Sequence, residues 1–219
     1  MRVDQADIPS HLKQLLKGQG IEELRPSQAK SITAGLFQDE NLLVCTPTAS
    51  GKTLVGVMAA IHGIKEHHAK ALYVVPLRAL ASEKLHSFRK DYPGLKVGMS
   101  SGERDSDDRY LEKYDLIILT SEKLDSLLRH HTPWLKSVKT VIVDEIHLLN
   151  DQSRGPTLEV VISLLRKLLP RHQLIGLSAT IGNPEELAAW LDAKLVQDEW
   201  RPVKLHKGVY TDGDIRYET

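Results

Sequence analysis

The chain has 219 residues, enough for one large domain or one domain with appendages. Hydrophobic residues make up 41% and charged residues 26%, so the sequence holds enough apolar material for a globular core. Lysine plus arginine and aspartate plus glutamate both total 29, and a formal net charge of zero argues against a protein whose overall field attracts nucleic acid.

The sequence also predicts a compartment. No apolar run approaches the ~20 residues that span a bilayer, and the first ten residues contain no apolar signal region. The single cysteine, Cys45, has no second cysteine with which to form an internal disulfide. We therefore expect a soluble cytoplasmic protein in a reducing environment, without a membrane partner.

The first predicted elements are helices. Apolar side chains recur at helical spacing over residues 8–19, and Pro26 suits the first turn of a second helix that ends near Phe37. We expect residues 1–25 to form an N-terminal helical extension of a domain that spans residues 26–198.

From residue 42 onward, short apolar runs alternate with amphipathic segments. The predicted strands are residues 42–45, 71–75, 96–99, 115–120, 140–145 and 174–180. The predicted helices between or after them are residues 52–67, 77–90, 106–113, 121–130, 157–169 and 184–191. This alternation predicts an α/β fold with a mostly parallel β-sheet and helices on both faces, and the continuous apolar strands support that burial. The polar residues 199–219 are expected to form an exit strand and linker.

A phosphate-binding loop follows the first predicted strand, at the end where open α/β sheets bind ligands. The loop and the start of the next helix contain Thr46, Pro47, Thr48, Ala49, Ser50, Gly51, Lys52 and Thr53. Backbone N–H groups there can surround phosphate oxygens, and Gly51 permits close approach because it has no Cβ. We expect Lys52 to bind the terminal phosphates of ATP and the Thr53 hydroxyl to ligate Mg²⁺. Thr46 replaces the first glycine of the usual motif, so a chance Gly-Lys-Thr turn is the alternative interpretation.

Two adjacent acids, Asp144 and Glu145, end the strand predicted over residues 140–145. We expect Asp144 to hold Mg²⁺ through water, and Glu145 to orient the attacking water and accept its proton. Lys52, Asp144 and Glu145 are therefore the predicted catalytic residues. A solvated Asp-Glu turn is the alternative, which the phosphate-binding loop upstream disfavours.

Further short segments complete the pattern: residues 24–28 (LRPSQ), 76–80 (PLRAL), 101–103 (SGE), 120–125 (TSEKLD), 144–147 (DEIH) and 178–180 (SAT). In this order, over nearly the whole chain, they resemble the superfamily 2 DExH helicases of the Ski-like (superkiller-type) branch, most of all its archaeal DNA-repair helicases. The resemblance implies a RecA-like motor domain of an ATP-dependent helicase or translocase, moving 3′ to 5′ on single-stranded or forked DNA. It also implies that Gln28 reads the adenine edge with its amide; an exposed helical glutamine is the alternative.

The resemblance implies that Pro76, Arg78, Gly102, Thr120 and Ser121 contact a nucleic-acid strand. Hydroxyls, backbone N–H groups at helix starts and an arginine can bind phosphates without reading bases, which suits a motor that walks over any sequence. The alternative is that these residues form ordinary helix starts, with a hydroxyl as a plain N-cap.

The resemblance further implies that Ser178 and Thr180 link the ATP site to the nucleic-acid site, with His147 as a neighbour. Their hydroxyls can hydrogen-bond to the loop of residues 144–147 and report phosphate loss. A strand-end turn is the alternative. Residues 154–156 (RGP) also fit the family, but we assign them no chemistry.

The sequence departs from the family pattern in two ways. Ala49 stands where many relatives have glycine, which stiffens the loop. No segment after residue 180 resembles a second RecA-like domain with its arginine finger, so we expect that domain elsewhere in a full-length chain. We expect the 219 residues alone to hydrolyse ATP slowly and not to unwind duplex.

Other functions stay open from the sequence. A nucleotide-gated nucleic-acid clamp is one, although a clamp has no need of a general base such as Glu145. An RNA helicase of the same branch is another, because a grip on the backbone does not reveal the sugar. A GTPase is disfavoured by the lack of a guanine motif, and a kinase by the ordered loops after residues 76 and 120. The ten histidines are expected on the surface rather than at a metal site.

Overall fold

A sheet of seven parallel strands forms the centre of the molecule. The computed structural model describes residues 1–100, 102, 108–203, 208–211 and 213–217. The strands are β1 (Leu42–Cys45), β2 (Lys70–Val75), β3 (Val97–Ser100), β4 (Leu116–Thr120), β5 (Val138–Val143), β6 (Gln173–Ser178) and β7 (Lys194–Gln197). Their order across the sheet is β3-β4-β2-β5-β6-β1-β7.

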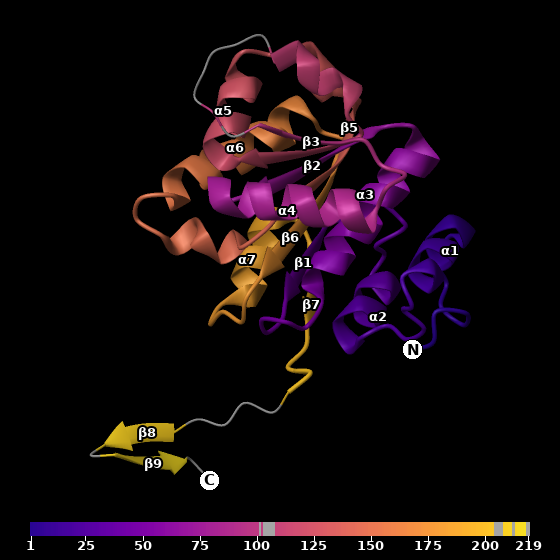
Figure 1. The fold of residues 1–219 in the computed structure, drawn as a ribbon. Coiled ribbons are helices and arrows are strands. Elements are labelled where there is room, and N and C mark those ends of the chain that lie inside the picture. Colours follow the sequence, from indigo (N-terminus) through magenta and orange to yellow (C-terminus); the bar gives the residue numbers. More distant parts are fainter. Residues whose placement is uncertain (101, 103–107, 204–207, 212, 218–219) are drawn as a thin grey trace.

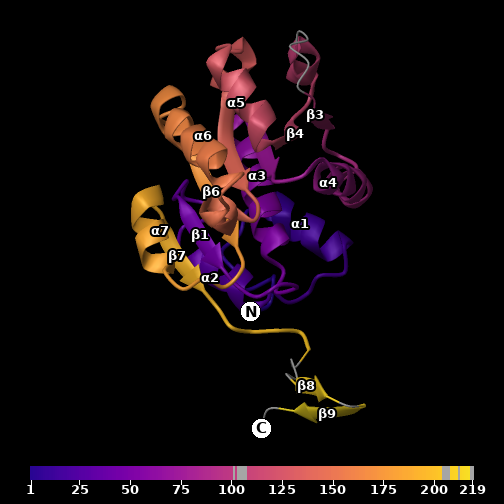
Figure 2. The ribbon, with the colours of Figure 1, turned by 90° about the vertical axis from the view of Figure 1, so that its left-hand side faces the viewer.

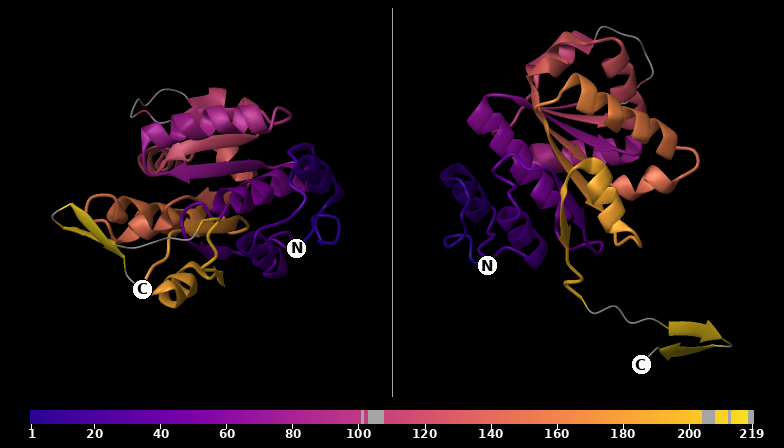
Figure 3. Two further views of the ribbon diagram at one scale, coloured as in Figure 1. Left: turned by 60° about the horizontal axis from the view of Figure 1, so that its bottom comes forward. Right: turned by 180° about the vertical axis from the view of Figure 1, so that it is seen from behind.

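Helices cover the sheet on both faces, as Figure 1 and Figure 3 show. They are α1 (Ser10–Gly18), α2 (Pro26–Thr33), α3 (Lys52–His67), α4 (Arg78–Asp91), α5 (Ser121–Arg129), α6 (Gly155–Leu168) and α7 (Pro184–Leu191), with 3₁₀ helices η1 (Asp108–Lys113), η2 (Pro133–Ser137) and η3 (Ile146–Asn150). Parallel strands need such crossover connections, because the end of one strand and the start of its neighbour lie at opposite edges.

Alternate residues of each strand divide the core into two halves. In β1, Leu42 and Val44 pack with α1 to α4, whereas Leu43 and Cys45 pack with α5 to α7. Side chains alternate between the two faces of a strand, so both sets must be apolar when helices cover both faces. This arrangement explains the uninterrupted apolar strands and confirms the predicted α/β fold.

The segments predicted to carry function leave the sheet at one edge. They are residues 46–51 after β1, residues 76–77 after β2, residue 102 after β3, residues 144–145 after β5 and residues 179–180 after β6. All seven strands are parallel, so these ends lie at the carboxyl edge, where α/β sheets bind ligands.

Helix α1 packs onto the same body. Leu12 and Leu16 are fully buried in the core half that contains Leu42. A backbone bridge between Arg2 and Glu23 closes the N-terminal segment on itself. The segment is therefore joined to the domain by apolar packing, and the boundary at residue 25 remains a prediction.

Three elements differ from the sequence prediction. The helix expected over residues 106–113 is the 3₁₀ helix η1, and residues 106 and 107 lie outside the described residues. Strand β7 was missed because it is short and only one of its four residues is buried. Instead of a single exit strand, the tail contains an antiparallel hairpin of β8 (Gly208–Thr211) and β9 (Asp214–Tyr217), with Gly213 at a φ of 93° in the turn. The hairpin stands apart from the sheet in Figures 1 and 2.

Candidate nucleotide site and strand-binding surface

The loop after β1 presents an anion site at the start of α3. Thr46 Oγ1 and Ser50 Oγ hydrogen-bond across the loop at 2.7 Å. Thr46, Pro47 and Ser50 are buried, whereas Thr48 and Ala49 are exposed. The backbone N–H groups of Gly51, Lys52 and Thr53 donate no hydrogen bond to any residue that the structure describes. Free donors at a helix start, together with the helix dipole, attract an anion such as phosphate.

Gln28 and Arg25 brace this loop. Gln28 Nε2 donates to the Gly51 carbonyl oxygen at 3.1 Å, and Gln28 Oε1 accepts from the Arg25 N–H at 2.9 Å. Gln28 is 3% exposed, so it is not the exposed glutamine of the alternative interpretation; its contact with adenine remains a prediction. A Cβ at Gly51, which has a φ of 92°, would meet both side chains. Glycine is therefore required by the brace, where the sequence argument gave phosphate approach as the reason.

Lys52 points from the loop toward the acid pair. Its side chain is 9% exposed, and its Nζ lies 3.6 Å from Glu145 Oε1. Glu145 has a φ of 53°, and its backbone N–H donates to Asp144 Oδ1 at 3.0 Å. This left-handed residue turns the two carboxylates toward different partners. The three residues predicted to be catalytic thus lie together at one edge of the sheet.

Asp144 contacts two residues that sequence reasoning missed. Tyr73 Oη donates to Asp144 Oδ2 at 2.9 Å, and Lys84 Nζ lies 3.6 Å from the same oxygen. Lys84 Nζ also donates to Thr53 Oγ1 at 3.2 Å. Burial first, and then the Asp144 charge, raise the pKa of Tyr73 well above its ordinary value of 10, so the phenol remains a donor. No motif marks either residue, since Tyr73 lies within an apolar strand and Lys84 within an amphipathic helix.

The oxygen donors at this point fit a magnesium ion. The Thr53 hydroxyl and the Asp144 carboxylate are ligands that Mg²⁺ prefers, and the ion keeps several of its waters. Both oxygens face one cation already, the Lys84 ammonium. They are therefore close enough to share a cation, which supports the fit.

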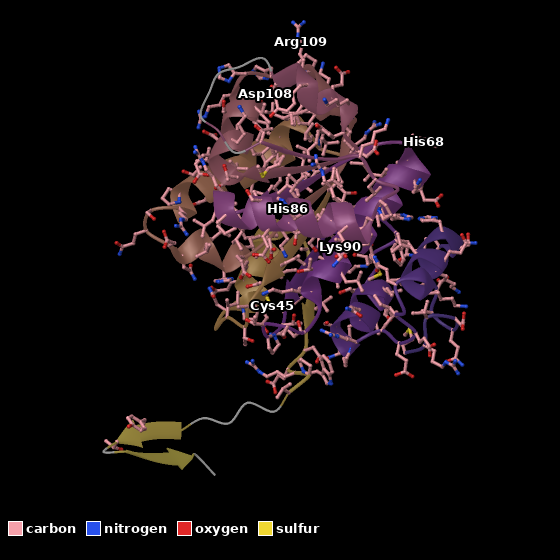
Figure 4. All side chains as sticks on the ribbon, viewed as in Figure 1. Cys45, His68, His86, Lys90, Asp108 and Arg109 are labelled. Carbon is pink, nitrogen blue, oxygen red and sulfur yellow. The ribbon has the colours of Figure 1, made fainter. Side chains whose placement is uncertain are left out.

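An open pocket of about 1030 Å³ adjoins the loop. Gln28, Gly51 and Thr53 form one wall, and residues 18–23 with residues between 87 and 92 form the others. Lys90, labelled in Figure 4, belongs to the part supplied by α4. No sequence motif marked these outer walls, because only the packing of α1 and α4 beside the loop brings them there.

A contact through His147 joins the loops that follow β5 and β6. The Ala179 N–H donates to His147 Nδ1 at 3.4 Å, and the same nitrogen lies 3.4 Å from Glu145 Oε2. The tautomer of the His147 ring decides whether Nδ1 accepts from Ala179 or donates to Glu145. Ser178 is buried and Thr180 exposed, and neither hydroxyl bonds to this loop among the described residues. The link therefore runs through a backbone N–H and an imidazole, where hydroxyls were expected.

A second pocket, of about 390 Å³, lies at the ends of β2, β3 and β4. Its lining residues are Pro76, Leu77, Arg78, Gly102, Thr120, Glu122, Lys123, Ser126 and Arg154. The three loops predicted to contact a strand thus meet in one concave surface. The sheet order β3-β4-β2 brings them together, because β4 lies between β2 and β3 and the ends of all three strands are adjacent.

Two arginines supply positive charge to this pocket. The side chains of Arg78 and Arg154 make no hydrogen bond or ion pair with other residues in the described ranges. Asp151 Oδ1 accepts the backbone N–H groups of Ser153 and Arg154, both at 2.9 Å, and so shapes the loop that presents Arg154. Unpaired guanidinium groups suit phosphate oxygens. Arg154 belongs to the segment for which the sequence suggested no chemistry.

The hydroxyl residues beside this pocket are buried. Thr120 is 4% and Ser121 5% exposed, and Thr120 Oγ1 accepts the Lys123 N–H at 3.4 Å. Thr120 is thus the plain N-cap of α5 that the alternative interpretation described. Ser101 and Glu103, beside Gly102, lie outside the described residues. Contacts of Thr120, Ser121 and Gly102 with a strand remain predictions.

One cluster with metal-ligand chemistry lies away from the nucleotide site. Ligand atoms of Asp39, His62 and His67 lie within 4.8 Å of one another. His62 is 8% exposed, so the expectation that the histidines lie on the surface is wrong for this residue. Asp39 already binds His67 Nε2 at 3.2 Å and Lys139 Nζ at 2.9 Å. The carboxylate charge is therefore matched without an ion, and we assign no metal there.

Comparison with known families agrees with this geometry. Residues 25–187 match the family model described as DEAD/DEAH box helicase. The matched stretch runs from the Arg25 brace past the phosphate-binding loop and the acid pair. The chain belongs to the DEAD/DEAH box helicase family.

Curated relatives of this helicase domain confirm the resemblance seen in the sequence. It is 52% identical over its whole length to the ATP-dependent DNA helicase Hel308 of Pyrococcus abyssi, and 46% identical over its whole length to that of Thermococcus kodakarensis. Over 93% of the chain it is 53% identical to Hel308 of Methanococcus vannielii. The chain spans only 30%, 19% and 28% of these three relatives.

Solved helicase structures share the fold. Mycobacterium smegmatis helicase Lhr, bound to single-stranded DNA and AMP-PNP, superposes with a TM-score of 0.73 and 31% identity over 86% of this chain and 27% of that one. The helicase MrfA bound to DNA and AMPPNP gives a TM-score of 0.73 and 28% identity over 88% of this chain and 29% of that one. The RecA-like prediction is thereby confirmed. None of the helices described in this helicase domain is both long and apolar enough to cross a membrane.

Proposed function

We propose that this chain is the first RecA-like motor domain of an ATP-dependent DNA helicase. The observation that supports it most is the meeting of free N–H donors at the start of α3, Lys52 and the acid pair at one edge of the sheet. The Lys52 ammonium is 3.6 Å from the Glu145 carboxylate, and a triphosphate on those donors would take the place of Glu145 beside it.

The residues divide the chemistry between them. Lys52 exchanges Glu145 for the terminal phosphates of ATP, and the released Glu145 then orients the attacking water and accepts its proton. Thr53 and Asp144 hold Mg²⁺, which supplies neutralisation of the phosphate charge. The loop of residues 46–51 cradles the phosphates, and Gln28 recognises the adenine.

The link between chemistry and movement passes through His147. Its Nδ1 lies between Glu145 and the Ala179 N–H, so loss of the terminal phosphate changes the partners of Glu145 and then of His147. Ser178 and Thr180 flank Ala179 and follow its displacement.

The second pocket grips the nucleic acid by its phosphates. Arg78 and Arg154 are the cations, and Pro76, Gly102, Thr120 and Ser121 shape the surface. We favour DNA over RNA because the relatives are named DNA helicases and the structural neighbours are bound to DNA.

Because the relatives are more than three times as long as this chain, we propose a second RecA-like domain in the remainder of the full-length protein. That domain contributes an arginine finger and further contacts with the strand, and ATP closes the two domains on each other. Opening after hydrolysis moves the strand.

The test is Lys52→Ala in the full-length protein. We expect loss of ATP turnover, because the ammonium that binds the terminal phosphates is gone, while the exposed Lys65→Ala leaves turnover intact. Turnover is measured without nucleic acid, with single-stranded DNA and with RNA of the same length. Unchanged turnover in Lys52→Ala would refute the site, stimulation by RNA alone would indicate the RNA helicase, and a wild-type protein without turnover would indicate the clamp.

A further inference from the structure

The Lys84 ammonium contacts both oxygen atoms that we assign to magnesium. Lys84 Nζ is 3.2 Å from Thr53 Oγ1 and 3.6 Å from Asp144 Oδ2. It also lies 5.7 Å from the centroid of the Tyr73 ring, a cation–π distance. The side chain is 17% exposed, so it is held by these three contacts rather than extending into solvent.

Asp144 depends on this ammonium for its charge balance. The carboxylate is 8% exposed, and its neutral donors are the Tyr73 hydroxyl and the Glu145 N–H. Among the described residues, Lys84 is the cation paired with it. A carboxylate this buried loses most of its hydration and needs such a partner.

We propose that Lys84 and Mg²⁺ compete for the same two oxygens. Before nucleotide binds, the ammonium holds Thr53 and Asp144 in position; when Mg²⁺ binds with nucleotide, Lys84 withdraws. The inference rests on the proposed function, which assigns Thr53 and Asp144 to the metal. Mg²⁺ binds oxygen ligands at about 2.0–2.1 Å and keeps several of its waters. An ion held directly by Thr53 and through water by Asp144 would therefore stand only a few ångströms from the Lys84 ammonium, which contacts the same two oxygens.

Repulsion between Lys84 and Mg²⁺ determines the direction in which Mg²⁺ binding should change when Lys84 is removed. Like charges a few ångströms apart in a partly buried site repel strongly, because little water screens them. Lys84 therefore raises the Mg²⁺ concentration that the site needs. Lys84 also stabilises the nucleotide-free protein, because it is the cation paired with Asp144. A lysine that served as a phosphate ligand would instead strengthen nucleotide binding at every Mg²⁺ concentration.

The experiment measures binding of a fluorescent ADP, N-methylanthraniloyl-ADP, while Mg²⁺ is titrated from an EDTA-treated sample. In Lys84→Met we expect the Mg²⁺ midpoint to fall about tenfold, as expected for removal of one partly screened charge. Lys84→Arg, which keeps the charge, stays near wild type. Lys65→Met removes an equivalent charge from an exposed position on α3 and leaves the midpoint unchanged. Lys84→Gln repeats the measurement if methionine disturbs packing.

A second readout uses no nucleotide. The melting temperature of the nucleotide-free protein falls in Lys84→Met but not in Lys65→Met, because Asp144 loses its cation. An unchanged or higher melting temperature would overturn the holding role. An unchanged Mg²⁺ midpoint, or weaker nucleotide binding at saturating Mg²⁺, would overturn the competition. If wild-type binding does not depend on Mg²⁺, or survives in Lys52→Ala, the proposed function itself fails, which is a distinct outcome.

Discussion

At the scale of the residue, the roles proposed here depend on neighbours that are distant in sequence. Gly51 shows this most clearly. A Cβ at this position would collide with the Gln28 and Arg25 side chains, and the positive φ also favours glycine. Asp144 shows it too, since Tyr73 and Lys84 determine its environment. A sequence motif identifies the residue proposed to carry the chemistry. The neighbours of that residue in the fold determine its charge environment and its position.

Ala49 provides a test at this scale. It has a φ of 65°, where an L residue is destabilised by roughly 1–2 kcal/mol, and no Cβ is needed at this exposed position. We expect Ala49→Gly to raise the free energy of unfolding by about 1 kcal/mol, part of the strain relief being offset by the greater freedom of glycine in the unfolded chain.

The measurement is urea unfolding at equilibrium. Ala189→Gly, at an exposed site in α7, is the matched control and should instead lose about 1 kcal/mol, because glycine is unfavourable within a helix. Equal losses in both variants would show that Ala49 is not strained.

At the scale of the element, an ion pair joins α2 to the segment that follows β7. Lys30 Nζ lies 2.8 Å from Asp198 Oδ2 and donates to the Gln197 carbonyl oxygen at 2.8 Å. Burial would raise the pKa of Asp198, but the Lys30 hydrogen bond, the Trp200 N–H and the Lys30 charge outweigh it and hold the pKa below its ordinary value of 3.8. The edge strand, whose sequence signal was weak, is thus secured by a tertiary contact.

This pKa predicts how stability depends on pH. A lowered folded-state pKa means that the stabilisation is present above the unfolded value near 3.8 and is lost as the pH falls through the folded value. We expect Lys30→Met to melt below wild type at pH 7, with a gap that narrows below about pH 4 as Asp198 becomes protonated. The bond to Gln197 is independent of this protonation, so a small gap remains.

Melting temperatures of both proteins between pH 3 and pH 7 provide the measurement, and Lys167→Met, at an exposed position in α6, controls for loss of one charge. A gap that stayed constant over the whole range would assign the stabilisation to Gln197 alone.

At the scale of the whole molecule, the proposed nucleotide site and the proposed strand-binding surface lie along one edge of one sheet. Pro76, Ser121, Asp144, Glu145 and Arg154 line a common small pocket between them. A change at the acid pair therefore has a short path to the loops that we propose to contact the strand. Both sites are open on this edge, and we propose that the second motor domain covers it.

The proposed role of a second domain predicts slow turnover by the 219 residues alone. We expect the chain to bind ATP but to hydrolyse it about 10³–10⁵ times more slowly than the full-length protein, because the arginine finger would come from the second domain that we propose. Phosphate release with excess single-stranded DNA provides the measurement, and strand separation of a forked duplex is its companion assay. Unwinding by the purified chain at a rate near that of the full-length protein would contradict the proposal.

The sequence by itself determined the alternation of strands and helices, the phosphate-binding loop and the acid pair. These features are local: apolar periodicity reports burial, and Gly51, Lys52 and Asp144 stand beside a strand end in the chain itself. The family resemblance followed from the order of such short segments.

Only the tertiary structure decided which side chains meet. Tyr73 and Lys84 reach Asp144, and Arg154 reaches the loop of Arg78, because the strand order places distant segments side by side. The outer walls of the pocket beside the phosphate-binding loop were hidden for the same reason, whereas strand β7 was missed because only one of its four residues is buried. Contacts between residues far apart in the chain leave no periodic pattern in it, so they become visible only when the sheet assembles.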